Sequence, residues 1–146
     1  MNYNEMKFSQ EKPISGTFGE VWLDGEYVAE CKALQAKLDF DKEKITIPRQ
    51  YTVGHKIMSA EGKGSLTLFK MSSRMGRLIS DKFKKGESME FTIVSKLADP
   101  QSYGTERVSL EGVIFDDLTL ADWKRAEIGE VDAPFTFANH DYLDMI

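Results

Sequence analysis

The sequence predicts a mainly β protein, an antiparallel β-sandwich or barrel with one packed helix and a long β-hairpin loop. Three observations predict it. Short segments in which apolar and polar residues alternate recur along the 146 residues, as expected for strands with one buried face. One segment has helical spacing instead. Turn-forming Gly, Pro and Asp residues separate these segments. A chain of this length is expected to form a single domain over residues 1–146.

The first third of the chain contains a terminal segment, a hairpin and a strand. Residues 1–13 are polar and aperiodic, which predicts an N-terminal arm without regular structure. Asp24-Gly25 separates two apolar stretches and predicts a hairpin, because this pair tolerates the positive φ angles of a type I′ turn. The alternation over residues 34–40 predicts a strand, and Pro48 is expected to end it because proline cannot donate to a ladder.

Residues 48–64 are predicted to form a long loop. The segment is polar and contains Gly54, Gly62 and Gly64. Loops longer than about 12 residues are uncommon in compact domains and are usually functional or disordered. We therefore expect this loop to be mobile in the free subunit and to order against a neighbouring one. A strand is expected to follow it at residues 65–71.

The helix is predicted around residues 75–83. Ser72 or Ser73 can cap its start, and Gly86 fits a left-handed stop at its end. A helix this short is stable only when packed on a sheet. Its apolar face is expected to consist of Met75, Leu78, Ile79 and Phe83.

The second half returns to strands. Apolar alternation predicts strands near residues 89–94, 108–112, 118–120 and 135–137, with a turn over residues 99–104 between the first two. The chain then ends in an acidic stretch to which no element is assigned.

The amino-acid composition argues against several classes of protein. Apolar residues make up 41% of the chain, charged residues 29%, and the formal net charge is −5. A dedicated nucleic-acid binder usually has a basic surplus. No apolar run approaches the roughly 20 residues that span a bilayer, and the polar start lacks a secretory signal. Cys31 is the sole cysteine, so no disulfide forms within the chain. We expect no membrane partner.

No convergent chemical site is expected. His55 and His140 lie far apart in predicted loops, and Cys31 lies in an apparent strand, where a small buried thiol is the usual occupant. The carboxylate pairs lack the spacing of a calcium loop. Gly62-Lys63-Gly64-Ser65 lacks the spacing of a phosphate-binding loop and precedes a strand. The residues therefore predict a structural or binding protein with no catalytic residues, no metal and no cofactor.

The order of several short motifs resembles that of a known family. The motifs are Ile14-Ser15-Gly16 with Gly19, Val21 and Leu23-Asp24-Gly25-Glu26; Gly54-His55-Lys56; Gly62-x-Gly64-Ser65-Leu66-Thr67-Leu68; Gly104-Thr105-Glu106-Arg107-Val108-Ser109-Leu110; and Pro134-Phe135-Thr136-Phe137. In this order they resemble the phage tail tube proteins related to the tube subunit of a defective Bacillus prophage. The resemblance covers nearly the whole chain.

The resemblance implies a subunit of the inner tube of a contractile phage tail or phage-derived bacteriocin, a tailocin. Its expected partners are other copies of itself in stacked hexameric rings, the tail sheath protein, the tape measure protein and the baseplate. In an infecting phage, DNA would pass through the lumen without specific binding. The expected location is the virion or tail-like particle, after synthesis in the bacterial cytoplasm. Candidate inter-subunit contacts lie in the predicted loop and helix: Pro48, Arg49, Thr52, Gly54, His55, Lys56, Arg74 and Arg77.

Two alternative functions are also compatible with the sequence. One is another tail component, such as a baseplate or tail-terminator subunit. The other is a β-barrel that binds a small ligand, which would need apolar residues and a few convergent polar groups facing its interior. An enzyme is the least supported class.

Overall fold

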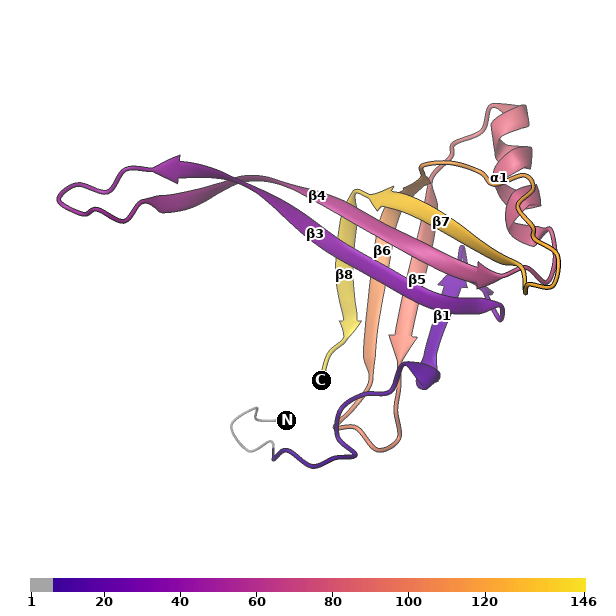
Figure 1. The fold of residues 1–146 in the computed structure, drawn as a ribbon, viewed down its shortest axis with the longest axis horizontal. Coiled ribbons are helices and arrows are strands. Elements are labelled where there is room, and N and C mark those ends of the chain that lie inside the picture. Colours follow the sequence, from indigo (N-terminus) through magenta and orange to yellow (C-terminus); the bar gives the residue numbers. More distant parts are fainter. Residues whose placement is uncertain (1–6) are drawn as a thin grey trace.

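The computed structural model describes residues 7–146. This part of the chain forms eight strands, one α-helix and a short 3-10 turn (Figure 1). In chain order the elements are η2 (Gly16–Phe18), β1 (Gly19–Leu23), β2 (Glu26–Tyr27), β3 (Cys31–Ile45), β4 (Gly54–Phe69), α1 (Arg74–Lys85), β5 (Phe91–Leu97), β6 (Glu106–Phe115), β7 (Glu130–Phe137) and β8 (Asn139–Asp144).

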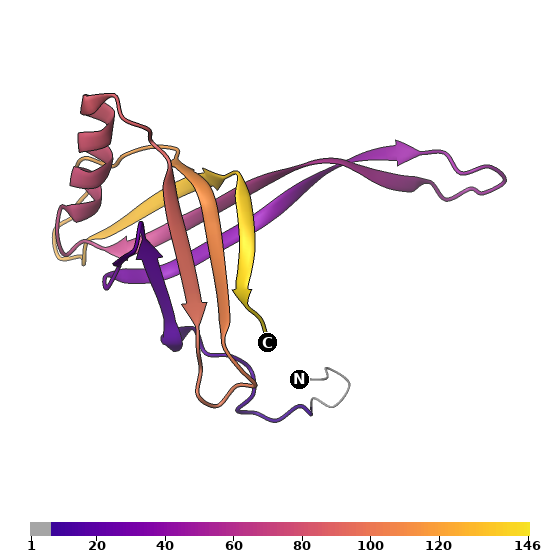
Figure 2. The same cartoon turned by 180° about the vertical axis from the view of Figure 1, so that it is seen from behind.

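The strands form two crossing layers joined through β6. The order is β2-β1-β5-β6-β7-β4-β3, and β8 also pairs with β6. The first half of β6 pairs with β8, whereas Ile114 and Phe115 at its end pair with β7. One layer therefore contains β1, β5, β6 and β8, and β3, β4 and β7 cross it (Figures 1 and 2). The predicted mainly β fold, with antiparallel pairing and one helix, is confirmed.

The chain passes from one layer to the other at Ala138, between β7 and β8, and Gly112 of the neighbouring strand β6 leaves room for it. Gly112 has a φ of +64°, and a Cβ built on it would lie 2.9 Å from the Cβ of Ala138. Ala138 stands between β7 and β8 and donates its backbone N–H to the carbonyl of Glu111. A larger residue at position 112 would face both an unfavourable φ and this close contact.

The hydrophobic core lies between the layers. Leu66 of β4, Ile93 of β5 and Val113 of β6 are fully buried. Phe115 joins two neighbouring aromatic rings, with its centroid 5.3 Å from that of Phe91 and 6.1 Å from that of Phe135. Both pairs adopt the edge-to-face geometry that aromatic rings favour.

The hairpin predicted at Asp24-Gly25 is confirmed. β1 pairs with β2 across this turn, and the two residues have φ angles of +49° and +83°. The Asp24 carboxylate also accepts a hydrogen bond from the Thr92 backbone N–H at 2.8 Å. This contact ties the turn to the start of β5.

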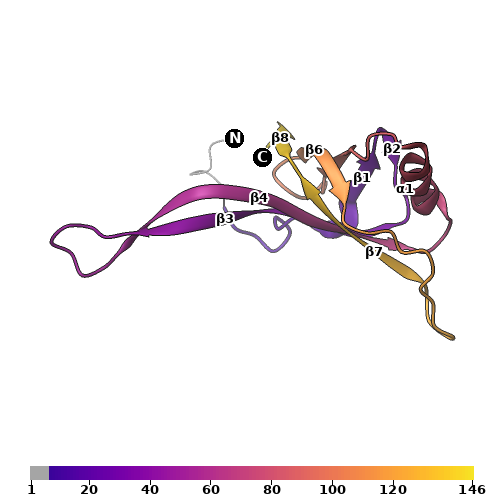
Figure 3. The ribbon, with the colours of Figure 1, turned by 90° about the horizontal axis from the view of Figure 1, so that it is seen from above.

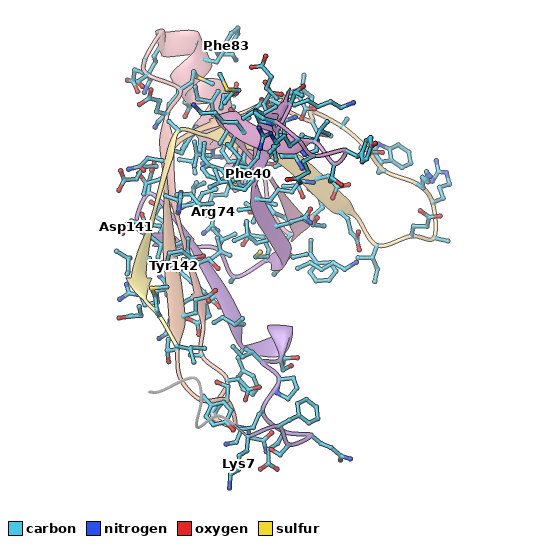
Figure 4. The ribbon with its side chains drawn as sticks, turned by 90° about the vertical axis from the view of Figure 1, so that its left-hand side faces the viewer. Lys7, Phe40, Arg74, Phe83, Asp141 and Tyr142 are labelled. Carbon is cyan, nitrogen blue, oxygen red and sulfur yellow. The ribbon has the colours of Figure 1, made fainter. Side chains whose placement is uncertain are left out.

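The predicted helix forms, with one correction. Gly86 closes it in the left-handed conformation (φ +68°), as expected. Of the two serines predicted to cap its start, the Ser72 hydroxyl accepts a hydrogen bond of 3.4 Å from the Arg74 backbone N–H, and the other makes none. Ile79 is buried, whereas the side chain of Phe83 is 75% exposed. The expectation that Phe83 belongs to the packed face was wrong. Figure 4 shows it at the outer end of α1, at the top of the view.

The prediction of a loop over residues 48–64 was wrong for Gly54–Gly64. These residues belong to β4, which pairs with β3 along its length, from Ile45 opposite Gly54 to Cys31 opposite Leu68. The glycines that indicated a loop allow close packing instead. A Cβ on Gly64 would lie 2.5 Å from the Phe135 ring, and one on Gly62 would lie 2.6 Å from the Phe137 ring.

Two predictions in the last third of the chain need correction. The alternation over residues 118–120 does not form a strand, because this segment lies in the irregular connection between β6 and β7. The acidic end, to which no element was assigned, forms β8. Backbone pairing with β6 stabilises β8, although all its residues are exposed.

The predicted N-terminal arm is described in part. Residues 7–13 contain turns and no strand or helix, while residues 1–6 lie outside the described part of the chain. The Tyr103 hydroxyl hydrogen-bonds to the backbone of Lys7, and the Lys12 ammonium lies 4.8 Å from the centre of the same ring. These contacts place the segment beside the turn between β5 and β6.

Candidate assembly surfaces

A two-stranded extension is the most prominent feature of the molecule. β7 supports β4 as far as Gly62, which pairs with Phe137. Beyond that point, residues 39–61 of β3, β4 and their connecting loop pair only with one another. We call residues 39–61 the extension. Figures 1 and 3 show it projecting from the body, away from α1. At about 3.3 Å per residue, its paired part projects roughly 20 Å or more.

The extension exposes apolar side chains that the subunit does not cover. The sequence predicted one apolar and one wet face for this strand, but every residue of β3 beyond Leu34 is exposed. Tyr51 is fully exposed, and Phe40 is half exposed on the part of β3 that points toward the viewer in Figure 4. The other exposed large apolar residues of the extension are Ile45, Ile47, Val53, Ile57 and Met58. Isolated exposed apolar residues are ordinary, but such a series on one element indicates a contact surface.

The far end of the extension is basic. We call residues 42–56 the extension tip. It carries four basic side chains, Lys42, Lys44, Arg49 and Lys56, and one acidic side chain, Glu43. Within the described part of the chain none of the four basic groups has an ion-pair partner. The tip is therefore free to pair with acidic groups outside its own subunit.

The eight predicted contact residues fall into two groups at opposite ends of the molecule. Pro48, Arg49 and Thr52 lie in the loop of the extension, and Gly54, His55 and Lys56 begin β4 beside it. Arg74 and Arg77 lie on α1.

The two helix arginines differ in their surroundings. The Arg74 guanidinium makes hydrogen bonds of 3.2 Å to both carboxylate oxygens of Glu30, whose side chain is mostly buried. Arg74 therefore anchors α1 to the start of β3. Arg77 is exposed and remains a candidate for contacts with another molecule.

Three strands have an edge without a partner among residues 7–146. β2 and β3 end the strand order, and β8 pairs with β6 alone. An unpaired edge presents backbone donors and acceptors that another chain can use. An ion pair at 3.5 Å, between Arg107 and Asp144, holds the end of β8 against β6.

An apolar groove lies beside α1, at the end of the molecule opposite to the extension. We call it the α1 groove. Its apolar lining comes from α1, from the connection to β5, from β6 and from the connection between β6 and β7, and two carboxylates flank it. The apolar residues are Ile79, Phe83, Met89, Phe115, Leu118 and Leu120, and the carboxylates are Asp116 and Asp117.

The connection between β6 and β7 is a surface that the sequence analysis missed. Leu120 is 84% exposed, and Trp123 and Ile128 are also largely exposed. Figure 3 shows the connection projecting from the body near α1. The available signal was a tryptophan among charged residues in a segment with no complete strand pattern.

The described residues offer little for chemistry. No group of three His, Cys, Asp or Glu among residues 7–146 is placed to hold a metal ion. The space between α1, β4 and β7 is small, with a volume of about 30 Å³, and the larger hollows on the described part of the chain are open to solvent. Burial raises the pKa of the Cys31 thiol, which disfavours the reactive thiolate. No helix in the described part is both long and apolar enough to cross a membrane.

Comparison with known proteins identifies the family. The family model described as "Phage tail tube protein" matches residues 6–144. The chain belongs to this family. It is 36% identical over 138 residues to the phage-like element PBSX protein XkdM of Bacillus subtilis (strain 168), covering 93% of this chain and 94% of that protein. The resemblance noted in the sequence is confirmed.

The fold also recurs in parts of contractile injection systems. The tube-terminating cap of the anti-feeding prophage superposes with a TM-score of 0.71 at 12% identity, over 99% of this chain and 100% of that chain. A chain from the extended sheath–tube complex of an extracellular contractile injection system, PVC, gives 0.70 at 8% identity, over 93% and 95%. At these identities the likeness shows a shared fold. Members of the tail tube family and these neighbours are structural components of tails.

Proposed function

We propose that this protein is the inner tube subunit of a phage tail or phage-derived contractile particle, and that its copies assemble into stacked hexameric rings around a hollow lumen. The observation that carries the proposal is the extension. The apolar side chains of this two-stranded ribbon are exposed to a large extent in the single subunit, and isolated two-stranded ribbons are marginally stable in water. A neighbouring subunit would cover that surface.

The free edges of β3 and β8 support the same conclusion. In a closed ring each edge can meet an edge of the next copy, which removes the aggregation risk of an open sheet. The β3 edge runs onto the extension, whereas the β8 edge lies on another part of the surface. One subunit can therefore contact more than one neighbour at once.

The proposed partners follow from this role. A tube subunit would contact the sheath on its outside, and the baseplate and tape measure protein within the particle. The net charge of −5 suits a conduit that DNA crosses without binding in an infecting phage, because like charges repel. The protein would be made in the host cytoplasm and act in the assembled particle.

Electron microscopy of the concentrated, purified protein tests the proposal. We expect rings of six subunits and tubes of many rings, and sedimentation should show large species that increase with concentration. Single rings that never stack would favour a tail terminator instead. A strictly monomeric protein at millimolar concentration, even with a tail initiator present, would contradict an assembly role.

A further inference from the structure

We propose that the extension tip of one subunit docks in the α1 groove of a second copy. The inference rests on the proposed function, because it names the partner surface for the extension. The two surfaces lie at opposite ends of one subunit (Figures 1 and 2). A contact between them is therefore heterologous, and such contacts form rings when the rotation closes and filaments when it does not.

The tip and the groove both expose large apolar side chains. Tyr51 projects from the tip with its side chain fully exposed. In the groove, Phe83 is 75% and Leu120 84% exposed, so both surfaces leave large apolar side chains in water. An aromatic side chain that enters an apolar groove is the usual form of an interface anchor.

The tip and the groove carry opposite charges. The tip carries an excess of three positive charges, apart from His55. Asp116 and Asp117 flank the groove, where Lys84 is the one basic residue of the lining. Neither Asp116 nor Asp117 has an ion-pair partner within residues 7–146. Opposite charges left unpaired on both surfaces favour this pairing and orient it.

The shape of the subunit prevents the tip from docking in its own groove. The extension projects away from α1 (Figures 1 and 3), and two paired strands cannot fold back on the body without breaking their ladder. The tip therefore meets an α1 groove only on another molecule. This geometry prevents a subunit from satisfying its own contact and leaves both surfaces available for growth.

Cysteine cross-linking between two chain types tests the docking directly. Both chains carry Cys31→Ser; one also carries Thr52→Cys in the tip, and the other carries Leu120→Cys in the groove. After mixing, assembly and mild oxidation, we expect a covalent dimer of the two types. The matched control pairs Thr52→Cys with Gln101→Cys, an exposed position in the turn between β5 and β6, and should give little dimer.

Charge reversal with rescue is the second test. Asp116→Lys with Asp117→Lys should abolish pelletable polymer, as should Lys44→Glu with Arg49→Glu. A chain with all four changes should regain polymer, because the charges are again opposite. Glu26→Lys, on the β1–β2 hairpin, is the control and should polymerise normally.

The outcomes separate the docking from the function. If the protein forms rings or tubes but positions 52 and 120 do not cross-link, the docking proposal is wrong and the tube function stands. If no variant and no wild-type preparation assembles, the proposed function itself fails. Loss of polymer in both reversed variants without rescue in the combined chain would also overturn the docking.

Discussion

Gly64 shows how closely single atoms are constrained where the layers cross. It pairs with Ala36 of β3 and with Phe135 of β7, so it lies in the middle of a three-stranded layer. A Cβ there would lie 2.5 Å from both the Phe135 ring and the Gln35 carbonyl oxygen. Phe135 is almost completely buried and has no free space into which to move.

Gly64→Ala should therefore lower the free energy of unfolding by about 1–3 kcal/mol, the usual cost of overpacking a core. Urea denaturation followed by fluorescence measures it. Gly76→Ala is the matched control, because a Cβ at Gly76 in α1 meets nothing within 4 Å and alanine favours a helix by about 0.5–1 kcal/mol. Equal effects of the two changes would show that close packing at Gly64 is not limiting.

At the scale of elements, α1 and the extension have opposite roles. α1 covers one end of the core through Ile79, and an ion pair between Arg74 and Glu30 fixes its start. The extension adds little to the core of its own subunit, since its large apolar side chains are exposed. One element stabilises the subunit, and the other presents surface to its surroundings.

Two substitutions in α1 separate packing from exposure. Ile79→Ala should lower the free energy of unfolding by about 2–5 kcal/mol, because it leaves a cavity under the helix. Phe83→Ala should change it by about 0.5 kcal/mol or less, because Phe83 is largely exposed. Thermal or urea unfolding of the free subunit tests both. A large loss for Phe83→Ala would place its side chain in the core.

Shortening the extension tests its role as an element. Replacing residues 42–58 by Asn-Gly joins Asp41 to Ser59, which face each other in the ladder, through a favoured two-residue turn. We expect a folded monomer that does not polymerise, because the removed residues contribute no buried side chain to the core. Circular dichroism and sedimentation measure the two properties. Normal polymerisation of this variant would exclude the extension from assembly.

At the scale of the whole molecule, the two ends are different. The tip is basic and apolar, and the opposite end carries the α1 groove with its two carboxylates. Subunits with unlike ends join head to tail, so an open polymer exposes a tip at one end and a groove at the other. The polarity of a tube would then originate in the asymmetry of each subunit.

Unlike ends predict that the shortened chain acts as a terminator. The shortened chain keeps the groove, so it can bind the tip of a full-length subunit. It has no tip of its own with which to bind a further subunit. Added to full-length protein in rising proportion, it should shorten the polymers seen by electron microscopy. The shortened chain with Asp116→Lys and Asp117→Lys serves as control, and it should leave polymer length unchanged. If both chains shortened the polymers equally, head-to-tail growth through the tip and the α1 groove would be contradicted.

Local patterns in the sequence determined most of the body strands, the Asp24-Gly25 turn, the helix with its stop at Gly86, and the family. These features depend on side-chain periodicity and on backbone preferences that neighbouring residues express directly. The same reasoning placed six contact candidates near position 50, and the structure brings these together on the extension.

Tertiary structure alone decided the rest, because it depends on which distant residues meet. Gly62 and Gly64 indicated a loop, but they lie in a strand because the Phe137 and Phe135 rings pack over them. β8 has no apolar face of its own, and it exists because β6 offers an edge. The alternation that predicted a buried face in β3 continues onto an extension where no partner within the chain covers it. An alternating pattern indicates that a strand has an apolar face. It does not specify whether the same chain or another molecule covers that face.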